Sequence, residues 1–292
     1  MNVITILKIV LAVVTIVTTL LIVADCAKHK DELKGAKVGQ WITLAIIGFL
    51  TNFFDTWGIG SFAPTQASFK FTKTSPDETV PGTLNVGDTL PVSIEALCFL
   101  GFVNIDPLTL VLMLVAAAAG AYIGAGIVSK WDLKTVRIVM AIFLVACAIV
   151  TVMRTAKIGP FGVAGEALGL TGIKLIIGVV GNFILGALMM VGFGLYSPCI
   201  ALVAMLGMNV GTAFPIMMGS CALLMNVSVF KFVKEGKYDR KATLCLALFG
   251  CVGVWIAYKV ACFLPLSTLT YIICCVMLYT SFVFFKDAKK VA

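Results

Sequence analysis

The sequence predicts an all-α polytopic membrane protein, and three observations carry this prediction. Of its 292 residues 61% are hydrophobic and 12% are charged, whereas about a quarter of the residues of a soluble domain are charged. The apolar runs are continuous over about 20 residues, which is typical of membrane-spanning helices and not of the alternating strands of a membrane barrel. A short block rich in glycine and proline also occurs twice, which indicates an internal repeat.

The apolar runs predict about nine transmembrane helices, because a helix satisfies its own backbone hydrogen bonds inside lipid. The expected spans are residues 3–24, 39–59, 83–102, 107–129, 135–153, 171–190, 212–232, 242–260 and 262–285. The first run is longer than the apolar core of a typical signal peptide. We therefore expect it to be a retained helix.

The basic residues lie in short loops between the apolar runs, where they act as topology signals. The net charge of +8 is explained in this way, and we expect no nucleic-acid partner. If the 28–37 loop lies inside the cell, nine crossings place 154–170, 231–241 and the C-terminal tail inside as well. The same count places Lys130, Lys134 and Arg137 outside. This parity changes if one segment in each half enters the membrane and returns on the same side.

Cysteine and histidine give no sign of a metal or cofactor site. None of the ten cysteines forms a C-x-x-C pair, most of them fall within or beside apolar runs, and the one histidine, His29, lies in a charged loop. Cysteines in such positions are small apolar packing residues. We expect no cofactor, no bound metal and no disulfide framework.

The repeated block reads "GIGSFAP" at Gly58 to Pro64 and "GFGLYSP" at Gly192 to Pro198, both G-x-G-x-x-x-P. The offset, 192 minus 58, is 134 residues, and it also carries Pro81 to Pro215. Upstream, "GFLTNF" is matched by "GVVGNF". We divide the chain into an additional N-terminal helix with its basic loop (1–37), a first repeat (38–153) and a second repeat (171–285). Four spans in each repeat would make the copies parallel, and an odd number would make them inverted.

Glycine and proline within an apolar run predict a pair of broken or re-entrant helices. Freed backbone groups at membrane depth must be buried in protein or line a wet cavity, and paired breaks in two halves are typical of a transporter's binding site. The half-helix after a break presents N–H groups and a positive dipole end, which suits an anion. The alternative is that these glycines only allow close helix packing, but packing requires neither the proline nor the duplication.

The candidate substrate-binding residues are the glycines, prolines and neutral donors of the two breaks and of the segments after them. They are Asn52, Gly58, Gly60, Ser61, Pro64, Thr83, Asn85, Asn182, Gly192, Gly194, Ser197, Pro198 and Ser220.

Three acidic residues, Asp55, Asp88 and Glu95, are the candidates for binding a coupling ion. Ionisable groups inside a membrane are costly and mark ion or proton pathways. The positions of the second half that correspond to them hold Leu185, Ala222 and Val229, so only the first half carries these carboxylates. The alternative is that Asp55 and Asp88 cap helix ends near water.

Enzymatic functions find no support in the motifs. The chain has no H-E-x-x-H, no histidine within any predicted span to activate a serine, and no G-x-x-x-x-G-K-[ST] to bind a nucleotide. We therefore expect neither an enzyme nor an ATP-driven pump.

With its twofold G-x-G block, the preceding "NF" elements and the downstream "VPGTLN" and "AFPIMMGS", the chain resembles the TauE/SafE permeases, the sulfite exporter and toluene-sulfonate uptake family. The resemblance covers residues 40–285. It implies secondary-active transport of a small anion, sulfite or an organosulfonate, with a proton or another coupling ion. The expected location is a bacterial plasma membrane, and a homo-oligomer is compatible with the sequence. The alternatives are a transporter of a small carboxylate or other non-sulfur anion, and a membrane scaffold that transports nothing.

Overall fold

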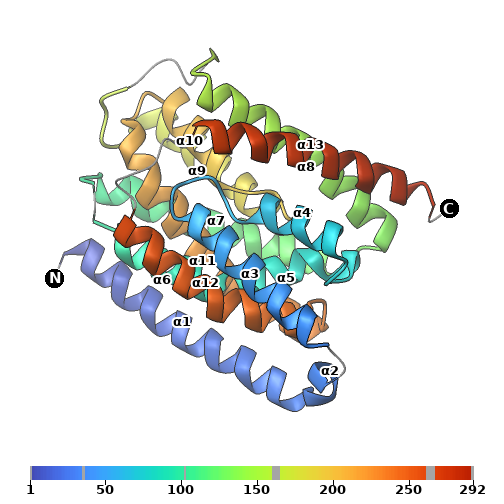
Figure 1. The fold of residues 1–292 in the computed structure, drawn as a ribbon. Coiled ribbons are helices and arrows are strands. Elements are labelled where there is room, and N and C mark those ends of the chain that lie inside the picture. Colours follow the sequence, from blue (N-terminus) through green and yellow to red (C-terminus); the bar gives the residue numbers. More distant parts are fainter. Residues whose placement is uncertain (1, 35–36, 102, 160–164, 261–266, 291–292) are drawn as a thin grey trace.

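The protein is a bundle of helices, seen in a computed structural model that describes residues 2–34, 37–101, 103–159, 165–260 and 267–290 (Figure 1). Within these ranges the chain forms no β-strand and has a single isolated bridge, between Ala167 and Met208. In chain order the helices are α1 (Val3–Lys28), α2 (Lys30–Lys34), α3 (Val38–Asp55), α4 (Phe62–Thr72), η1 (Asp77–Thr79), α5 (Val80–Gly87), α6 (Thr89–Phe99), α7 (Pro107–Val128), α8 (Leu133–Thr155), α9 (Gly172–Met189), α10 (Tyr196–Met205), η3 (Val210–Thr212), α11 (Ala213–Glu235), α12 (Arg240–Val260) and α13 (Ser267–Ala288).

Seven helices of the described residues are long and apolar enough to cross a membrane, namely α1, α3, α7, α8, α9, α11 and α12. The chain is therefore a multi-pass membrane protein. The predicted span 83–102 is two shorter helices, α5 and α6, which meet at Asp88. The predicted span 262–285 corresponds to α13, and its first residues, 262–266 with Cys262, lie outside the described residues.

Two further helices, α4 and α10, were not predicted as separate elements. They have 11 and 10 residues, which is about half of what a helix needs to cross the hydrocarbon core. A search for runs of about 20 apolar residues cannot find such helices. Each of them begins inside one of the two repeated blocks, two residues after the second glycine of its G-x-G.

The bundle has two ends, which the contacts between loops define. At the first, which we call the basic end, Arg240 pairs with Glu32, and Arg137 and Lys70 both pair with Asp77. At the opposite end the amide of Asp106 donates to Leu168 O at 2.8 Å, and the amide of Asn209 donates to Ala167 O at 2.9 Å. In Figure 1 the basic end lies to the right, with the C-terminus, and the opposite end to the left, with the N-terminus.

This arrangement distinguishes the two alternatives for how the loops are distributed between the ends. Arg137, with the neighbouring Lys130 and Lys134, lies at the same end as the 28–34 segment, and the 165–170 segment lies at the other end. Nine full crossings would place these two regions the opposite way round, whereas the alternative, one segment in each half that enters and returns, places them as they lie here. The physical reason is that the chain turns back after α3, so that α4 returns to the basic end, and turns back again after α9, so that α10 returns to the opposite end (Figure 1). α3 and α4 together therefore start and finish at the basic end, and α9 and α10 start and finish at the opposite end.

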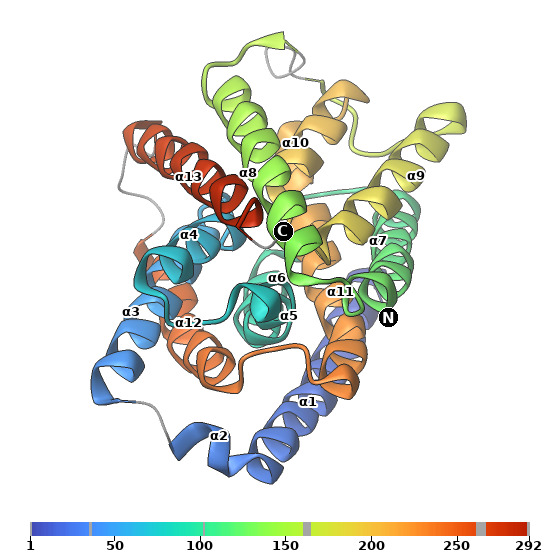
Figure 2. The same ribbon diagram turned by 90° about the vertical axis from the view of Figure 1, so that its right-hand side faces the viewer.

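The helices on either side of residue 165 make reciprocal contacts. α3 packs along α12, and α9 packs along α7; α4 contacts α13, and α10 contacts α8. α8 and α13 pack against each other, as do α6 and α11. Figure 2 shows α5 and α6 in the middle of the bundle, surrounded by the longer helices.

Glycines allow α3 and α12, and likewise α7 and α9, to pack closely along their length. An added Cβ at Gly48 of α3 would lie 2.8 Å from the backbone oxygen of Cys245 in α12, and one at Gly253 would meet the backbone of α3. Gly120 of α7 and Gly186 of α9 face each other's helices in the same manner. Close packing by glycine, the alternative weighed for the G-x-G blocks, therefore operates at other glycines of this chain.

The N-terminal helix α1 is attached to the bundle by buried polar groups. Asn226 of α11 donates to Thr15 Oγ1 at 3.2 Å and to Ser93 Oγ at 3.0 Å, and Thr18 donates to the Asn226 Oδ1 atom. At the basic end, Arg240 pairs with Asp25 at 2.8 Å. These contacts hold α1 against α6, α11 and α12.

Candidate functional site

The first helix break comprises residues 56–61, between α3 and α4. Gly58 and Gly60 have φ angles of 78° and 94°, a region that residues with a side chain rarely adopt. The amide of Ser61 donates to Asp55 Oδ1 at 2.6 Å, so the carboxyl group at the end of α3 satisfies a backbone donor that the break has freed. The backbone carbonyl oxygen of Asn52 accepts hydrogen bonds from both the amide and the hydroxyl group of Thr56.

The second helix break comprises residues 190–195, between α9 and α10. Gly192 has a φ angle of 100°. Two backbone carbonyl oxygens of this region accept hydrogen bonds from side-chain amides of the first half of the chain. Asn85 Nδ2 donates to Met189 O at 3.3 Å, and Gln66 Nε2 donates to Gly192 O. The second break is therefore held by α4 and α5.

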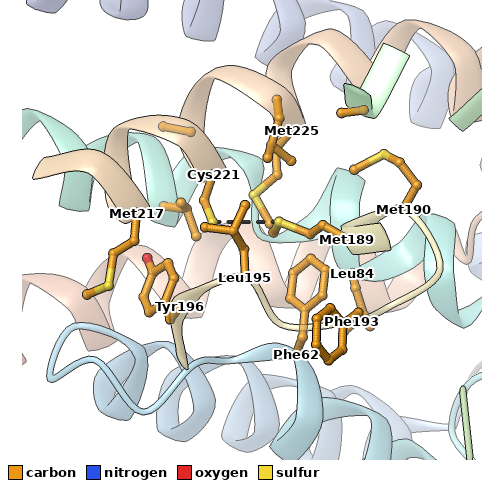
Figure 3. Close-up of a cluster of buried hydrophobic side chains, with 14 of the residues drawn as sticks. Phe62, Leu84, Met189, Met190, Phe193, Leu195, Tyr196, Met217, Cys221 and Met225 are labelled. Carbon is orange, nitrogen blue, oxygen red and sulfur yellow. Dashed lines mark hydrogen bonds between the residues drawn. The ribbon is translucent and has the colours of Figure 1, made fainter. Parts of the chain in front are cut away.

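The two breaks meet at a small buried cavity, which we call the central cavity. Its volume is about 20 Å³, enough for one water molecule. The first break and the start of α4 contribute Gly60, Ser61 and Phe62, and the second break and the start of α10 contribute Gly194, Leu195 and Tyr196. The surrounding helices add Asp55, Val92, Met189, Cys221 and Met225. Figure 3 shows Leu195, Tyr196, Cys221 and Met189 gathered around this point, with Phe62 beside them.

A second cavity, also of about 20 Å³, adjoins the first. It is lined by Ile59, Ala63, Thr151 and Ser197, together with four residues that also line the central cavity. These shared residues are Gly60, Phe62, Gly194 and Tyr196. Ser197 and Thr151 are within hydrogen-bond distance, 3.1 Å between their hydroxyl oxygens.

Three carboxyl groups are buried in this region, and one of them, Asp55, lines the central cavity. Asp55 is 2% exposed, and Asp88 and Glu95 are fully buried. Each is held by a different donor: Ser61 N for Asp55, Asn52 Nδ2 at 3.0 Å for Asp88, and the Tyr196 hydroxyl group at 2.6 Å for Glu95. Asp55 lies within electrostatic range of both other carboxyl groups.

No lysine, arginine or histidine is among the described residues that line either cavity. The oxygens Asp88 Oδ2 and Glu95 Oε1 are buried without a hydrogen-bond partner in the described part of the chain. Three ionised carboxylates buried together without a cation would repel one another strongly. The arrangement is suited to holding protons or another cation.

The structure brings four of the predicted site residues together at the central cavity: Asp55, Gly60, Ser61 and Gly194. Ser197 lines the second cavity. The remaining predicted residues line neither cavity: Asn52, Gly58, Pro64, Thr83, Asn85, Asp88, Glu95, Asn182, Gly192, Pro198 and Ser220.

Two of the predicted residues that line neither cavity, Asn182 and Thr83, make hydrogen bonds elsewhere in the bundle. Asn182 Nδ2 donates to Met113 O at 2.8 Å and to Ser220 Oγ at 2.9 Å, between α9, α7 and α11. Thr83 Oγ1 accepts from the amide of Asp239 at 2.8 Å, at the loop between α11 and α12.

The buried amide side chains have a consistent orientation. The Nδ2 groups of Asn52, Asn85 and Asn182 all donate to protein acceptors, whereas their Oδ1 atoms are buried without a donor among the described residues. The sequence suggested that these amides would donate to an anion. In the arrangement seen here, their N–H groups are occupied.

Phe62 and Gln66 are two residues of the site that the sequence did not indicate as candidates. The repeat offset of 134 carries Phe62 to Tyr196, so the repeat itself could have identified this pair. Gln66 gives no such signal, because its role depends on the position of a carbonyl group 126 residues away.

A larger cavity of about 1000 Å³ opens at the basic end. Lys70, Arg137 and Arg240 are among its lining residues, and they pair with Asp77, Asp287, Asp25 and Glu32. Lys70 Nζ lies 2.6 Å from Asp77 and 2.9 Å from Asp287, with 8% of the lysine side chain exposed. This ion-pair cluster joins α4 to α8 and α13.

Comparison with known proteins gives one family. The model of the family described as "Sulfite exporter TauE/SafE" matches residues 2–151, just over half of the chain, and so includes the N-terminal helix that the resemblance noted above left out. No curated protein and no solved structure matches the chain. With two helix breaks facing one buried cavity in a multi-pass bundle, and with this match, the chain belongs to the sulfite exporter TauE/SafE family of membrane transporters.

Proposed function

We propose that the protein is a secondary-active transporter of sulfite or an organosulfonate, which it binds between two broken helices and moves together with protons. One observation carries the proposal above the others. Two segments 134 residues apart, each a helix break that contains G-x-G, line the same buried cavity. Breaks of this kind at membrane depth are typical of transporter binding sites.

We also propose that residues 38–153 and 171–285 are inverted copies of one unit. The reciprocal contacts support this, since α3 and α12 pair as α9 and α7 do. The two hairpins also open toward opposite ends of the bundle (Figure 1). In a membrane, α3–α4 and α9–α10 would then be re-entrant hairpins entering from opposite sides, and residues 1–37 would be an addition to the repeats.

The substrate would contact the walls of the two cavities. Gly60, Ser61, Gly194 and Ser197 would offer backbone and hydroxyl donors to the anion, with the positive end of α10 beside it. The remaining predicted residues, including Asn52, Asn85 and Asn182, would hold the helices that form these walls. Because both cavities have the volume of a single water molecule, the arrangement seen here would be the occluded one, without space for an anion of several non-hydrogen atoms.

The buried carboxyl groups support coupling to protons. An anion next to ionised Asp55 would be repelled, and no basic side chain among the described lining residues offsets this repulsion. A protonated carboxyl group removes the repulsion and can donate a hydrogen bond. Asp55 would then carry the proton beside the substrate, with Glu95 and Asp88 next to it.

The membrane would be the cell membrane, with the basic end inside. Lysines and arginines are concentrated at that end, in the 28–34, 129–137, 231–241 and 286–290 segments, as expected for cytoplasmic loops. This orientation makes the cavity of about 1000 Å³ a cytoplasmic vestibule.

A thermal-shift series tests the proposal. Purified protein is heated in detergent with sulfite, organosulfonates, sulfate or small carboxylates, since a ligand stabilises the state that binds it. Stabilisation by sulfite and organosulfonates alone is expected. Stabilisation by carboxylates alone would favour the alternative anion class, and no stabilisation by any anion would favour a membrane scaffold.

A further inference from the structure

Two aromatic side chains at matching positions of the two repeated blocks line both the central cavity and its neighbour. Phe62 is the first residue of α4 and Tyr196 the first residue of α10, 134 positions later. They are 2% and 4% exposed. Both line both cavities, together with Gly60 and Gly194.

Neither cavity alone can hold a sulfite or sulfonate anion, since each has a volume of about 20 Å³. The two glycines that line both cavities, Gly60 and Gly194, have free space beside them, because an added Cβ at either would have no atom within 4 Å. The two aromatic side chains are therefore the bulky groups of the shared wall. Displacing them would join the two cavities into one chamber.

The two aromatic residues differ in one group, the hydroxyl of Tyr196. It donates to Glu95 Oε2 at 2.6 Å, and both residues are buried. This distance lies within the usual range of O–H···O hydrogen bonds. This bond connects the start of α10 to α6 and so fixes the second break against the first half of the chain.

We propose that Phe62 and Tyr196 form a central gate between the two cavities, and that the Tyr196–Glu95 hydrogen bond holds the gate closed. The inference rests on the proposed function, since it gives the gate an anion to admit. Opening requires the Tyr196 hydroxyl group to leave Glu95, and the two cavities then merge. Phe62 has no such bond and moves with the start of α4.

Cys221 reports on the gate without any substrate. It lines the central cavity, is 1% exposed, and carries a free thiol. The test measures the rate at which iodoacetamide alkylates Cys221 in the purified full-length protein, by mass spectrometry of the peptide. Cys245 of α12, 2% exposed and away from both cavities, is followed in the same sample as a reference for general loosening of the fold.

Tyr196→Phe removes the hydroxyl group and keeps the ring. We expect it to raise the Cys221 rate by about fivefold relative to Cys245, as the loss of one buried hydrogen bond implies. Glu95→Gln keeps an acceptor and should give a smaller increase. Tyr258→Phe, at a side chain 41% exposed on α12, is the matched control and should change nothing.

A second variant, Phe62→Ala, opens the wall without touching the hydrogen bond, and it should also raise the Cys221 rate. The proposal is overturned if both Tyr196→Phe and Phe62→Ala leave the Cys221 to Cys245 ratio at the wild-type value, or if the two rates rise in parallel. Because no anion is present, a changed ratio in a protein that binds no anion would reject the proposed function and retain the gate. An unchanged ratio in a protein that binds sulfite would do the reverse.

Discussion

The hydroxyl group of Tyr196 donates a hydrogen bond of 2.6 Å to Glu95, across 101 residues of sequence and between the two halves of the bundle. It is one of the polar contacts through which the first half holds the second helix break and the start of α10. Others are made by Gln66 and Asn85, which donate to carbonyl groups at Gly192 and Met189. The second break therefore depends on the first half for its geometry, whereas Asp55 stabilises the first break from within.

Substitution of Gly194 should separate binding from folding. An added Cβ there meets no atom within 4 Å, and the residue lines both cavities. A leucine side chain at this position would fill them. Gly194→Leu should therefore abolish stabilisation by sulfite in a thermal-shift assay and leave the protein in the membrane. Gly39→Leu, at an exposed glycine with equal space, should retain the full shift.

The glycines between α7 and α9 should behave in the opposite way. A Cβ at Gly186 would collide with the backbone of Ala117, which cannot move aside as a side chain can. Overpacking of this kind costs about 1–3 kcal/mol. Gly186→Ala should lower the melting temperature in detergent whether or not sulfite is present. A Gly186→Ala protein with the wild-type melting temperature would show that these helices are not closely packed.

Substitution of Asp55 tests the proposed coupling to protons. Asp55→Asn keeps an oxygen that can accept from the amide of Ser61 but removes the ionisable group. In proteoliposomes the variant should exchange labelled sulfite across the membrane and fail to accumulate it in response to a pH gradient. Accumulation that follows the gradient as in the wild type would remove Asp55 from the coupling mechanism. Asp132→Asn, at an aspartate on the loop before α8, is the control.

The ion-pair cluster at the basic end should contribute to stability. Lys70 is nearly buried and pairs with both Asp77 and Asp287, so Lys70→Gln leaves two aspartates with fewer partners. Loss of one member of a buried pair costs about 3 kcal/mol or more, which should appear as a large drop in melting temperature. Lys34→Gln removes an ion pair whose side chains are 74% and 95% exposed and should have almost no effect. Equal effects of the two substitutions would contradict the role given to Lys70.

Part of this site could be predicted from the sequence. The G-x-G blocks identified both breaks, because glycine and proline act on the backbone locally, and they led to Gly60, Ser61 and Gly194. Asp55, Asp88 and Glu95 were identified because acidic residues are rare inside apolar runs. The count of nine full crossings placed the middle loops at the opposite ends, because α4 and α10 are too short to be found as apolar runs.

The contacts across the halves could not be predicted. Gln66 and Tyr196 act on partners more than a hundred residues away, and nothing in their local sequence indicates the partner. For the same reason the amides of Asn52 and Asn85 were expected to donate to an anion. Their N–H groups are occupied by acceptors that only the folded chain brings near.

The most direct test of the central claim is the binding of sulfite labelled with radioactive sulfur to the purified protein, compared between the wild type and Gly194→Leu. The claim is that the anion binds between the two helix breaks. It predicts saturable binding by the wild type, competed by organosulfonates, and no specific binding by a Gly194→Leu protein that melts at the wild-type temperature. Equal binding by the two proteins would contradict it.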